Sequence, residues 1–468
     1  TFQPGREAVT TEPTDLGKRR ELFVDGFFLD RLDGARQRLH EPERRGYVLE
    51  VRPPHENACT GCYNLIDDGD GGLLLYYRGF YPIGADYADH HQRQTCNVAL
   101  SYDGVHFHRP TLGLFQQDPD GNPGVAPNTI WQGYEAHNLC VFLDRNPKAD
   151  PAARFKAVGG GAKNRLFALG SADGLNWERL QDEPLDVEGA FDSVNVPLWD
   201  PHAGCYRLFC RYFFESDGIR VRAIQSCTSD DFVHWTKPEP HRYDDGVPRE
   251  QFYTNATIPC PGAEHILLSF PMRFLPERTL DTEDMDYPQE GLSDAVFMSS
   301  RDGLHWDRTF RHAWLRPGRE QRNWTHRSQT PAVGIIDTGE GEWSMYIAEH
   351  YGWNDNRLRR VTVRPWGFAS LFAEQHGEAL TKPFTFNGGR LLLNYATSAA
   401  GSLRVEVQQG DGTPIPGFTL DKSQIMFGDQ IENAARWQDG TDVSSLQGRV
   451  VRLRIVLKDA DLFSIRFA

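Results

Sequence analysis

One turn signature recurs four times along the chain and constrains the fold more than any other feature. Asp-Gly favours a tight turn, and the aromatic residue that follows is typical of a side chain packed on a sheet face. Successive copies are spaced by roughly 60–70 residues, which suits a four-stranded sheet with long loops. The copies are "SYDGVHF" from Ser101, "SADGLNW" from Ser171, "SDDFVHW" from Ser229 and "SRDGLHW" from Ser300.

A weaker fifth copy, "RPWGFASLF", contains Trp366. Five units of four strands predict an all-β chain with a five-bladed β-propeller, and the alternative is chance recurrence of a common turn. The strand-like segment 21–30 is expected to complete the last blade and close the ring. Alternating strands without the signature predict a C-terminal β-sandwich. The expected organisation is an N-terminal arm over 1–20, the propeller over 21–378 and the sandwich over 379–468.

The amino-acid composition disfavours two classes of partner, nucleic acids and membranes. The 468 residues contain 50 Lys and Arg against 65 Asp and Glu, and this net charge of -15 disfavours nucleic acid and anionic membranes as partners. No apolar run of about 18 residues is present, so we expect no membrane insertion. The sequence leaves oligomeric state open and favours a secreted or periplasmic location, with a signal peptide removed before residue 1.

The eight cysteines include one isolated CxxC, Cys59 to Cys62. Without a second CxxC, buried thiols are favoured over a zinc or redox site. The histidines lack compact metal spacing. We therefore expect no metal ligand and no required cofactor, with an axial calcium or other divalent ion as the alternative.

The entry ends of the predicted inner strands carry a second pattern. Blades two to five place an amide at corresponding positions, and acids stand three residues before two of them. Because inner strands converge on the propeller axis, these acids are expected to face one pocket and to cleave a glycosidic bond by paired-carboxylate chemistry. The alternative is that such acids only cap loops. The expected catalytic residues are Glu56, Glu135 and Asp192, and the amides are Asn138, Asn195, Asn255 and Gln329.

Arginines end three predicted second strands, where they would return toward the same funnel. A guanidinium can fork onto a carboxylate, sulfate or phosphate, so these residues indicate either an anionic ligand or charge balance for the acids. The expected substrate-binding residues are His137, Asn138, Asn195, Arg78, Arg211, Tyr253, Asn255, Arg273, Trp324, His326, Arg327, Glu349 and His350.

Five blades with the S-x-D-G-x-x-W signature and a following sandwich resemble glycoside hydrolase family 32 and its relatives, including family 43. The resemblance implies three acids on blades one to three, which fall on Glu56, Glu135 and Asp192. The residue types are exchanged at each place, and the family's "NDPN" motif is absent, so the resemblance implies a divergent member.

The resulting hypothesis is a glycosidase (O-glycosyl hydrolase) acting on an oligo- or polysaccharide that is furanosidic or anionic. Two alternatives stay open, an inverting glycoside phosphorylase and a non-catalytic carbohydrate-binding propeller. Fold alone does not choose between them.

Overall fold

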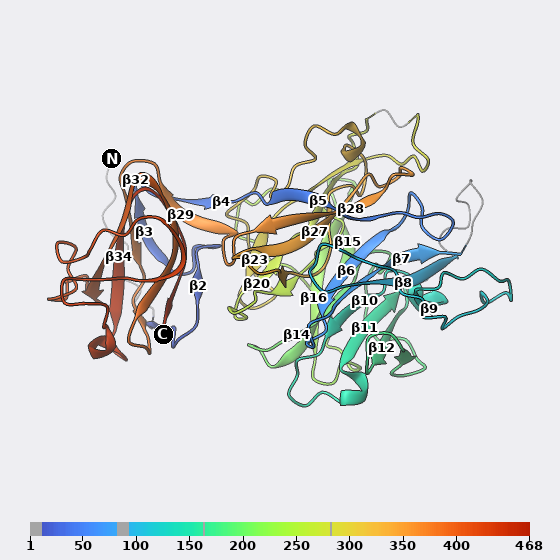
Figure 1. Ribbon diagram of the computed structural model, residues 1–468, viewed down its shortest axis with the longest axis horizontal. Coiled ribbons are helices and arrows are strands. Elements are labelled where there is room, and N and C mark those ends of the chain that lie inside the picture. Colours follow the sequence, from blue (N-terminus) through green and yellow to red (C-terminus); the bar gives the residue numbers. More distant parts are fainter. Residues whose placement is uncertain (1–11, 82–92, 162–163, 281–282) are drawn as a thin grey trace. The chain divides into compact units, whose positions relative to one another are not determined.

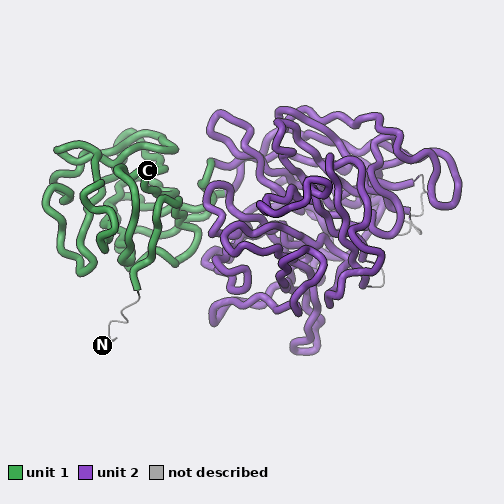
Figure 2. Tube along the Cα trace, turned by 90° about the horizontal axis from the view of Figure 1, so that it is seen from below, with its two compact units in different colours: residues 1–40, 365–468 green, residues 41–364 purple. Residues whose placement is uncertain are grey.

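The computed structural model describes residues 12–81, 93–161, 164–280 and 283–468, so part of the predicted N-terminal arm lies outside it. These residues are β-strands and loops with four short 3-10 helices and no α-helix. They form two compact units (Figure 2): one spans 41–364, and the other joins 12–40 to 365–468. None of the described helices has the length and apolarity to span a bilayer. The fold is the predicted all-β propeller and sandwich.

The first three blades are antiparallel four-stranded sheets (Figure 1). Blade one contains β6 (Gly61–Asp67), β7 (Leu73–Phe80), β8 (Gln94–Ser101) and β9 (Thr129–Gln132). Blade two contains β10 (Cys140–Leu143), β11 (Phe155–Gly160), β12 (Leu166–Ser171) and β13 (Glu178–Arg179), with η1 (Tyr134–Ala136) before it and η2 (Pro151–Ala153) within it. Blade three contains β14 (Val196–Asp200), β15 (Cys205–Ser216), β16 (Ile219–Ser229) and β17 (Glu239–Pro240).

The last two blades are less regular. Blade four contains β19 (Ile258–Pro259), β20 (Leu267–Ser269), β23 (Met298–Ser300) and β24 (Trp306–Asp307), extended by β18 (Gln251–Phe252), β21 (Met272–Leu275) and β22 (Leu292–Ala295). Blade five contains β25 (Thr330–Pro331), β26 (Ile336–Asp337), β27 (Trp343–Glu349) and β28 (Arg357–Val363), preceded by η3 (Gln321–Asn323). Its outer strand is β5 (Glu43–Glu50), which pairs antiparallel with β28.

The repeated signature is a side-chain-stabilised turn that follows the third strand of blades one to four. In blade one the Ser101 hydroxyl accepts a hydrogen bond from the Gly104 amide at 3.0 Å, and Asp103 Oδ1 accepts from the amides of Val105 and His106, both at 2.8 Å. The same bonds recur in the other three copies. The turn needs a positive φ at its glycine, which is 71° at Gly104. In blade three Phe232 stands at the glycine position and has the same φ of 71°.

The aromatic residue of the signature joins neighbouring blades. Trp177 packs edge-on against Tyr76 of blade one at 6.2 Å between ring centroids, and Trp306 packs likewise against Phe209 of blade three at 5.9 Å. The Tyr76 hydroxyl also donates to the Gly174 carbonyl at 2.9 Å. The repeat therefore marks the contacts that hold adjacent sheets together.

Two predicted boundaries change. Segment 21–30 does not close the ring: β2 (Glu21–Leu22) and β3 (Leu29–Asp33) pair with sandwich strands, and β5 supplies the closing strand instead. The fifth signature copy around Trp366 lies in the sandwich unit, because the chain leaves blade five after β28 and enters β29 (Ala369–Ala373). With β5 in place, blade five needs no fourth strand from that segment.

The sandwich unit is built on a 10-stranded sheet that surrounds its own buried core. Its two longest strands, β32 (Leu391–Gln409) and β34 (Val451–Phe467), pair antiparallel along most of their length. The other strands are β1 (Thr14–Asp15), β4 (Arg36–Leu39), β30 (Gly377–Thr381), β31 (Phe384–Thr385) and β33 (Asp429–Ala434), and η4 (Ser444–Leu446) follows β33.

Candidate functional site

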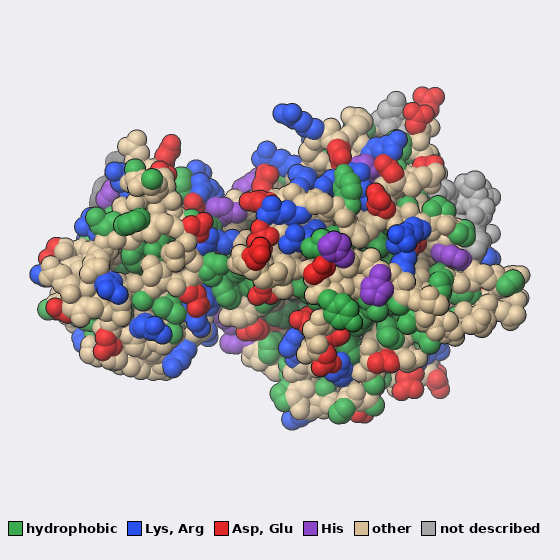
Figure 3. Space-filling model, in the orientation of Figure 1, with side chains coloured by type: hydrophobic (Ala, Val, Ile, Leu, Met, Phe, Trp, Pro, Cys, Tyr) green, Lys and Arg blue, Asp and Glu red, His purple; other side chains and the backbone are tan. Residues whose placement is uncertain are grey.

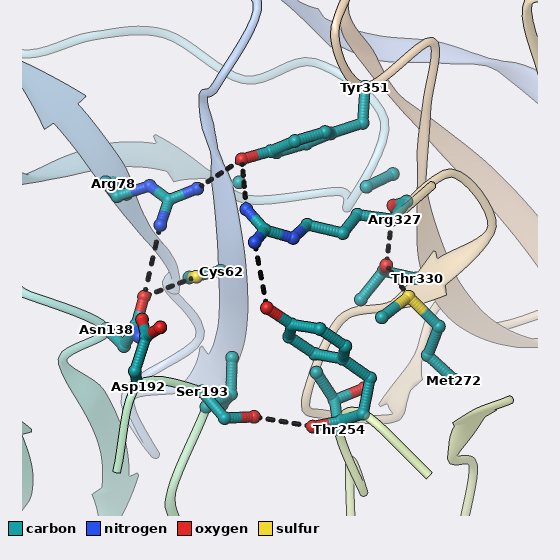
Figure 4. Close-up of a pocket in the computed structure, with 14 residues that line it drawn as sticks. Cys62, Arg78, Asn138, Asp192, Ser193, Thr254, Met272, Arg327, Thr330 and Tyr351 are labelled. Carbon is teal, nitrogen blue, oxygen red and sulfur yellow. Dashed lines mark hydrogen bonds between the residues drawn. The ribbon is translucent and has the colours of Figure 1, made fainter. Parts of the chain in front are cut away.

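One narrow pocket lies where the five blades meet, and each blade contributes to its lining (Figure 4). This convergence places the pocket on the propeller axis, as expected for inner strands and their entry loops. Five of the predicted site residues line it, one from each blade in order: Arg78, Asn138, Asp192, Tyr253 and Arg327.

Asp192 is the carboxylate that lines this pocket. Its Oδ1 lies 3.0 Å from Nε2 of His137, whose Nδ1 lies 2.8 Å from the Gln94 side-chain oxygen. The hydrogen bond from His137 lowers the pKa of Asp192, against the effect of burial, and the charges of Arg211 and Arg327 lower it further. Asp192 is therefore held ionised, in the state that a general base requires.

Gly161 makes room for this histidine. A Cβ on Gly161 would lie 2.6 Å from the His137 ring and 2.9 Å from the Phe191 carbonyl oxygen. The chain at this point passes too close to the His137 ring and the Phe191 backbone for any side chain.

Two arginines meet on one phenol in the pocket (Figure 4). Arg78 Nη2 and Arg327 Nη1 donate to the Tyr351 hydroxyl at 3.0 and 2.9 Å. Arg78 is also held by two hydrogen bonds that its Nε and Nη2 donate to the Cys59 carbonyl oxygen, at 3.1 and 2.6 Å. Their hydrogen-bond partners are neutral groups, and the Asp192 carboxylate, whose pKa the charge of Arg327 lowers, lines the same pocket without a direct ion pair to either guanidinium among the described residues.

Two further arginines stand beside them without a carboxylate partner in the described structure. Arg211 Nη2 donates to the backbone carbonyl of Asp192 at 2.6 Å, and Arg222 Nη1 donates to the Gln251 side-chain oxygen at 2.8 Å. Burial lowers the pKa of Arg222, and the like charges of Arg211, Arg220 and Arg327 lower it further. We call Arg78, Arg211, Arg222 and Arg327 the arginine cluster.

Tyr253 stands among these arginines. Its hydroxyl accepts a hydrogen bond from Arg327 Nη2 at 2.8 Å, and the Arg211 guanidinium lies 4.8 Å from its ring centroid. Burial by itself raises the pKa of a phenol, but the charges of Arg327 and Arg211 outweigh burial, so the pKa of Tyr253 is lowered. Tyr351, by contrast, has its pKa raised, chiefly by burial.

A second cavity of about 440 Å³ continues outward from Tyr253 and Arg327, which line both spaces. That volume is within the range of small-molecule sites. His326 lines it while only 3% exposed, and neither ring nitrogen has a hydrogen-bond partner among the described residues. Burial holds the pKa of His326 well below its usual value, so the ring is neutral and able to contact a ligand.

Backbone strain accompanies the pocket. Cys62, Asn138 and Arg327 all line it with left-handed φ values of 56°, 55° and 59°. Such conformations cost on the order of 1–3 kcal/mol each for residues other than glycine, and they gather at functional sites.

Glu56 and Glu135, predicted to be catalytic, line neither space. Glu56 is 2% exposed and forms a two-pronged ion pair with Arg109, at 2.6 and 2.5 Å. Glu135 lies in η1, where it pairs with Arg179 and accepts the Trp131 indole N–H at 3.2 Å. Both carboxylates are neutralised by arginines distant in sequence, which the inner-strand pattern does not reveal.

Several predicted binding residues serve the scaffold instead. Asn195 donates to the Phe191 and Ser193 carbonyls, at 3.0 Å each, and so shapes the loop that carries Asp192. Arg273 is neutralised by Asp294 and Glu250. Asn255 bonds to backbone groups, and the Trp324 indole donates to the Gly318 carbonyl oxygen at 2.9 Å. None of these four side chains lines the two cavities.

Glu349 and His350 belong to a separate network in blade five. Glu349 is 1% exposed and accepts Arg359 Nε at 2.7 Å and Arg357 Nε at 3.2 Å, while Arg357 Nη2 also pairs with Glu320 at 2.6 Å. The ligand atoms of Glu320, Glu349 and His350 lie within 4.8 Å of one another, as a metal site would require. The two guanidinium groups already occupy these carboxylate oxygens, which makes this an ion-pair network.

Sequence reasoning missed two residues of the site, Arg222 and Tyr351. Arg222 lies on the long β15–β16 hairpin, outside the inner-strand pattern, and the signal was its alternation with Arg220 after the Asp-Gly turn. Tyr351 follows β27, at the place where other blades carry arginine. The eight cysteines are free, and Cys59 is buried as expected whereas Cys62 is only partly so.

No family model and no curated protein matches the sequence. Among solved structures, the chain is similar to a protein titled glycoside hydrolase, with 12% identity, 70% of this chain and 93% of that chain covered, and a TM-score of 0.46. A β-1,2-mannobiose phosphorylase from Listeria innocua shares 13% identity over 69% and 96%, with a TM-score of 0.42. A fructofuranosidase from Schwanniomyces occidentalis shares 10% over 91% and 97%, with a TM-score of 0.38. At these identities none assigns a role to a residue here.

Proposed function

We propose that this chain is a glycoside hydrolase whose substrate carries an anionic group. The observation that carries the proposal is the arginine cluster: Arg78 and Arg327 line the inner pocket, Arg222 lines the second cavity with Arg327, and the hydrogen bonds described for all four guanidinium groups go to neutral oxygens. The single carboxylate of Asp192 does not offset four guanidinium charges, and uncompensated buried charge is costly to a fold, so the excess favours a ligand that supplies negative charge. The resemblance of the blades to families 32 and 43 supplies the substrate class, a glycoside.

Asp192 acts as the base in this proposal. Its carboxylate is held ionised and oriented by His137, and it faces the space that Arg78 and Arg327 line. A water molecule bound there would give its proton to Asp192 while its oxygen bonds to the anomeric carbon. The anionic group of the sugar would lie against the guanidinium groups, which fixes the ring relative to the carboxylate. No cofactor takes part in these steps.

The same observation favours phosphorolysis as the second candidate. Inorganic phosphate is an anion that arginines bind by forked contacts, and it would then replace water as the attacking group. Phosphorolysis needs no base for the nucleophile, so Asp192→Asn separates the two: it abolishes hydrolysis and leaves a phosphate-dependent reaction largely intact.

The test is a screen of uronic, sulfated and neutral polysaccharides for new reducing ends, with and without inorganic phosphate. The proposal expects cleavage of an anionic glycan in phosphate-free buffer and at least about tenfold slower cleavage of its neutral counterpart, the effect of about one lost charged contact. Strict phosphate dependence would select the second candidate. Sugar binding without turnover would identify a carbohydrate-binding propeller.

A further inference from the structure

A glycosidic bond breaks only if the leaving oxygen receives a proton, and the described pocket offers few groups that could supply one. Glu56 and Glu135 are tied to arginines and line neither cavity. Asp192 is ionised and serves as base. The remaining described acid is Glu290, which is exposed at the edge of the outer cavity.

We propose that Tyr253 is the general acid of this reaction, a role that rests on the proposed function. Tyr253 lines both the inner pocket, with Asp192, and the outer cavity, with His326. Tyr253 therefore borders both the pocket that holds the base and the cavity that we assign to the leaving group. Arg327 is the other described residue that lines both spaces, and a guanidinium does not give up a proton near neutral pH.

The hydroxyl of Tyr253 is arranged to give up its proton. It accepts a hydrogen bond from Arg327 Nη2 at 2.8 Å, and no described residue accepts its own hydrogen, which is left for a ligand. The guanidinium groups of Arg211, Arg327 and Arg222 lie 4.8, 5.2 and 5.4 Å from the ring centroid. When the phenol transfers its proton it becomes a phenolate, and these three positive charges stabilise that phenolate.

The ring is also held in place. Phe274 packs edge-on against it at 5.7 Å, and the Ser193 hydroxyl donates to the Tyr253 carbonyl oxygen at 2.6 Å. That bond links the loop of the base to the loop of the acid. Because Ser193 directly follows Asp192, this hydrogen bond ties the backbone of Tyr253 to the residue next to the base.

The step balances as follows. Water gives a proton to the Asp192 carboxylate, and its oxygen forms a bond to the anomeric carbon. The bond from that carbon to the leaving oxygen breaks, and the leaving oxygen takes the Tyr253 hydroxyl proton. Asp192 is then neutral and Tyr253 is a phenolate, and transfer of the proton from Asp192 to Tyr253 restores both.

The decisive experiment compares leaving groups. Tyr253→Phe keeps the ring and removes the proton, so it should slow cleavage of an alkyl glycoside by about 100-fold or more. Cleavage of the 2,4-dinitrophenyl glycoside of the same sugar, whose leaving group needs no proton, should fall less than about fivefold. Tyr351→Phe is the matched control because Tyr351 also accepts from Arg327; it should slow both substrates equally. Equal losses in Tyr253→Phe, or a leaving-group effect in Glu290→Gln instead, would overturn the proposal.

A second readout needs no substrate and separates this inference from the proposed function. Absorbance at the tyrosinate band, followed against pH, should show one tyrosine that ionises before all others, and Tyr253→Phe should remove it. Tyr102→Phe, a surface substitution at 85% exposure, should leave that step in place. If Tyr253→Phe removes no early step, the phenol is not the acid, whatever the enzyme cleaves. If the step is present but no glycoside is cleaved, the proposed function fails and the acidic phenol stands.

Discussion

Two groups of arginines in the propeller differ in how their charge is balanced. In blade five, Arg357 and Arg359 share Glu349 at 3.2 and 2.7 Å, and Arg357 also pairs with Glu320 at 2.6 Å, so each guanidinium faces a carboxylate. In the arginine cluster, the corresponding partners are carbonyl, amide and phenol oxygens. On the face that Figure 3 shows, basic and acidic side chains are interspersed, as in the blade-five network.

The charge balance of an arginine separates a structural role from a functional one. An arginine whose charge is cancelled inside the chain holds the fold together, as Arg273 does with Asp294 and Glu250. An arginine buried without a carboxylate is held by the scaffold at a cost in stability, and its charge is available to a ligand. The predictions below test this division.

The largest effect is expected at the carboxylate that faces the cluster. Asp192→Asn removes the base but keeps the shape, so kcat should fall by about a thousandfold with little change in thermal unfolding. Asp200, which pairs with Arg207 Nε at 2.7 Å outside both cavities, gives the opposite expectation. Asp200→Asn should lower the melting temperature and leave kcat near the wild-type value.

The next largest effect is expected on the free energy of unfolding, through the ion-pair network of Glu349 in blade five. Glu349→Gln leaves Arg357 and Arg359 without their shared carboxylate, so the free energy of unfolding should fall by about 3 kcal/mol. Urea unfolding followed by tryptophan fluorescence measures it. A variant as stable as the wild type would show that balanced arginines are not what holds blade five together.

Substitution of Arg222 should lower substrate affinity without lowering the free energy of unfolding. Arg222→Gln removes a charge repelled by its neighbours, so the free energy of unfolding should stay unchanged or rise by about 1 kcal/mol while substrate affinity falls. Arg220→Gln, two residues away and exposed, should change neither quantity. A strongly destabilised Arg222→Gln would mean that the cluster is balanced by something other than a ligand.

The pH profile of the reaction should follow the two shifted groups. The pKa of Asp192 is lowered in the ligand-free protein, so kcat/KM should hold as the pH falls through the usual carboxyl range and drop only below it. The pKa of Tyr253 is also lowered, so kcat/KM should fall on the alkaline side sooner than an ordinary phenol would allow. Tyr253→Phe should lose the alkaline limb. An acid limb in the usual carboxyl range would contradict the assignment of Asp192.

Local signals in the sequence predicted the blades, but not the closing strand. The Ser-Asp-Gly turn is stabilised by its own side chains, so the sequence alone identifies the turn wherever it occurs. Segments 21–30 and 43–50 both look like strands, and only long-range pairing with β28 selects the second. Nothing in either segment encodes its partner.

The candidate site was predicted in outline for a similar reason. Strand ends lead to the axis, which located Asp192, Asn138 and Arg327. Whether a charged residue there is free or paired depends on residues elsewhere in the fold, such as Arg109 and Arg179, which neutralise Glu56 and Glu135. The sequence shows charges, and only the fold shows which are cancelled.

The most direct measurement of the central claim is calorimetric titration of glucuronate, galacturonate and inorganic phosphate, with glucose and galactose as neutral counterparts. We expect at least one anion to bind about tenfold or more tightly than any neutral sugar, and we expect Arg222→Gln to erase this preference while Arg220→Gln keeps it. Equal binding of charged and neutral probes by the wild-type protein, or no binding of any anion, would contradict it.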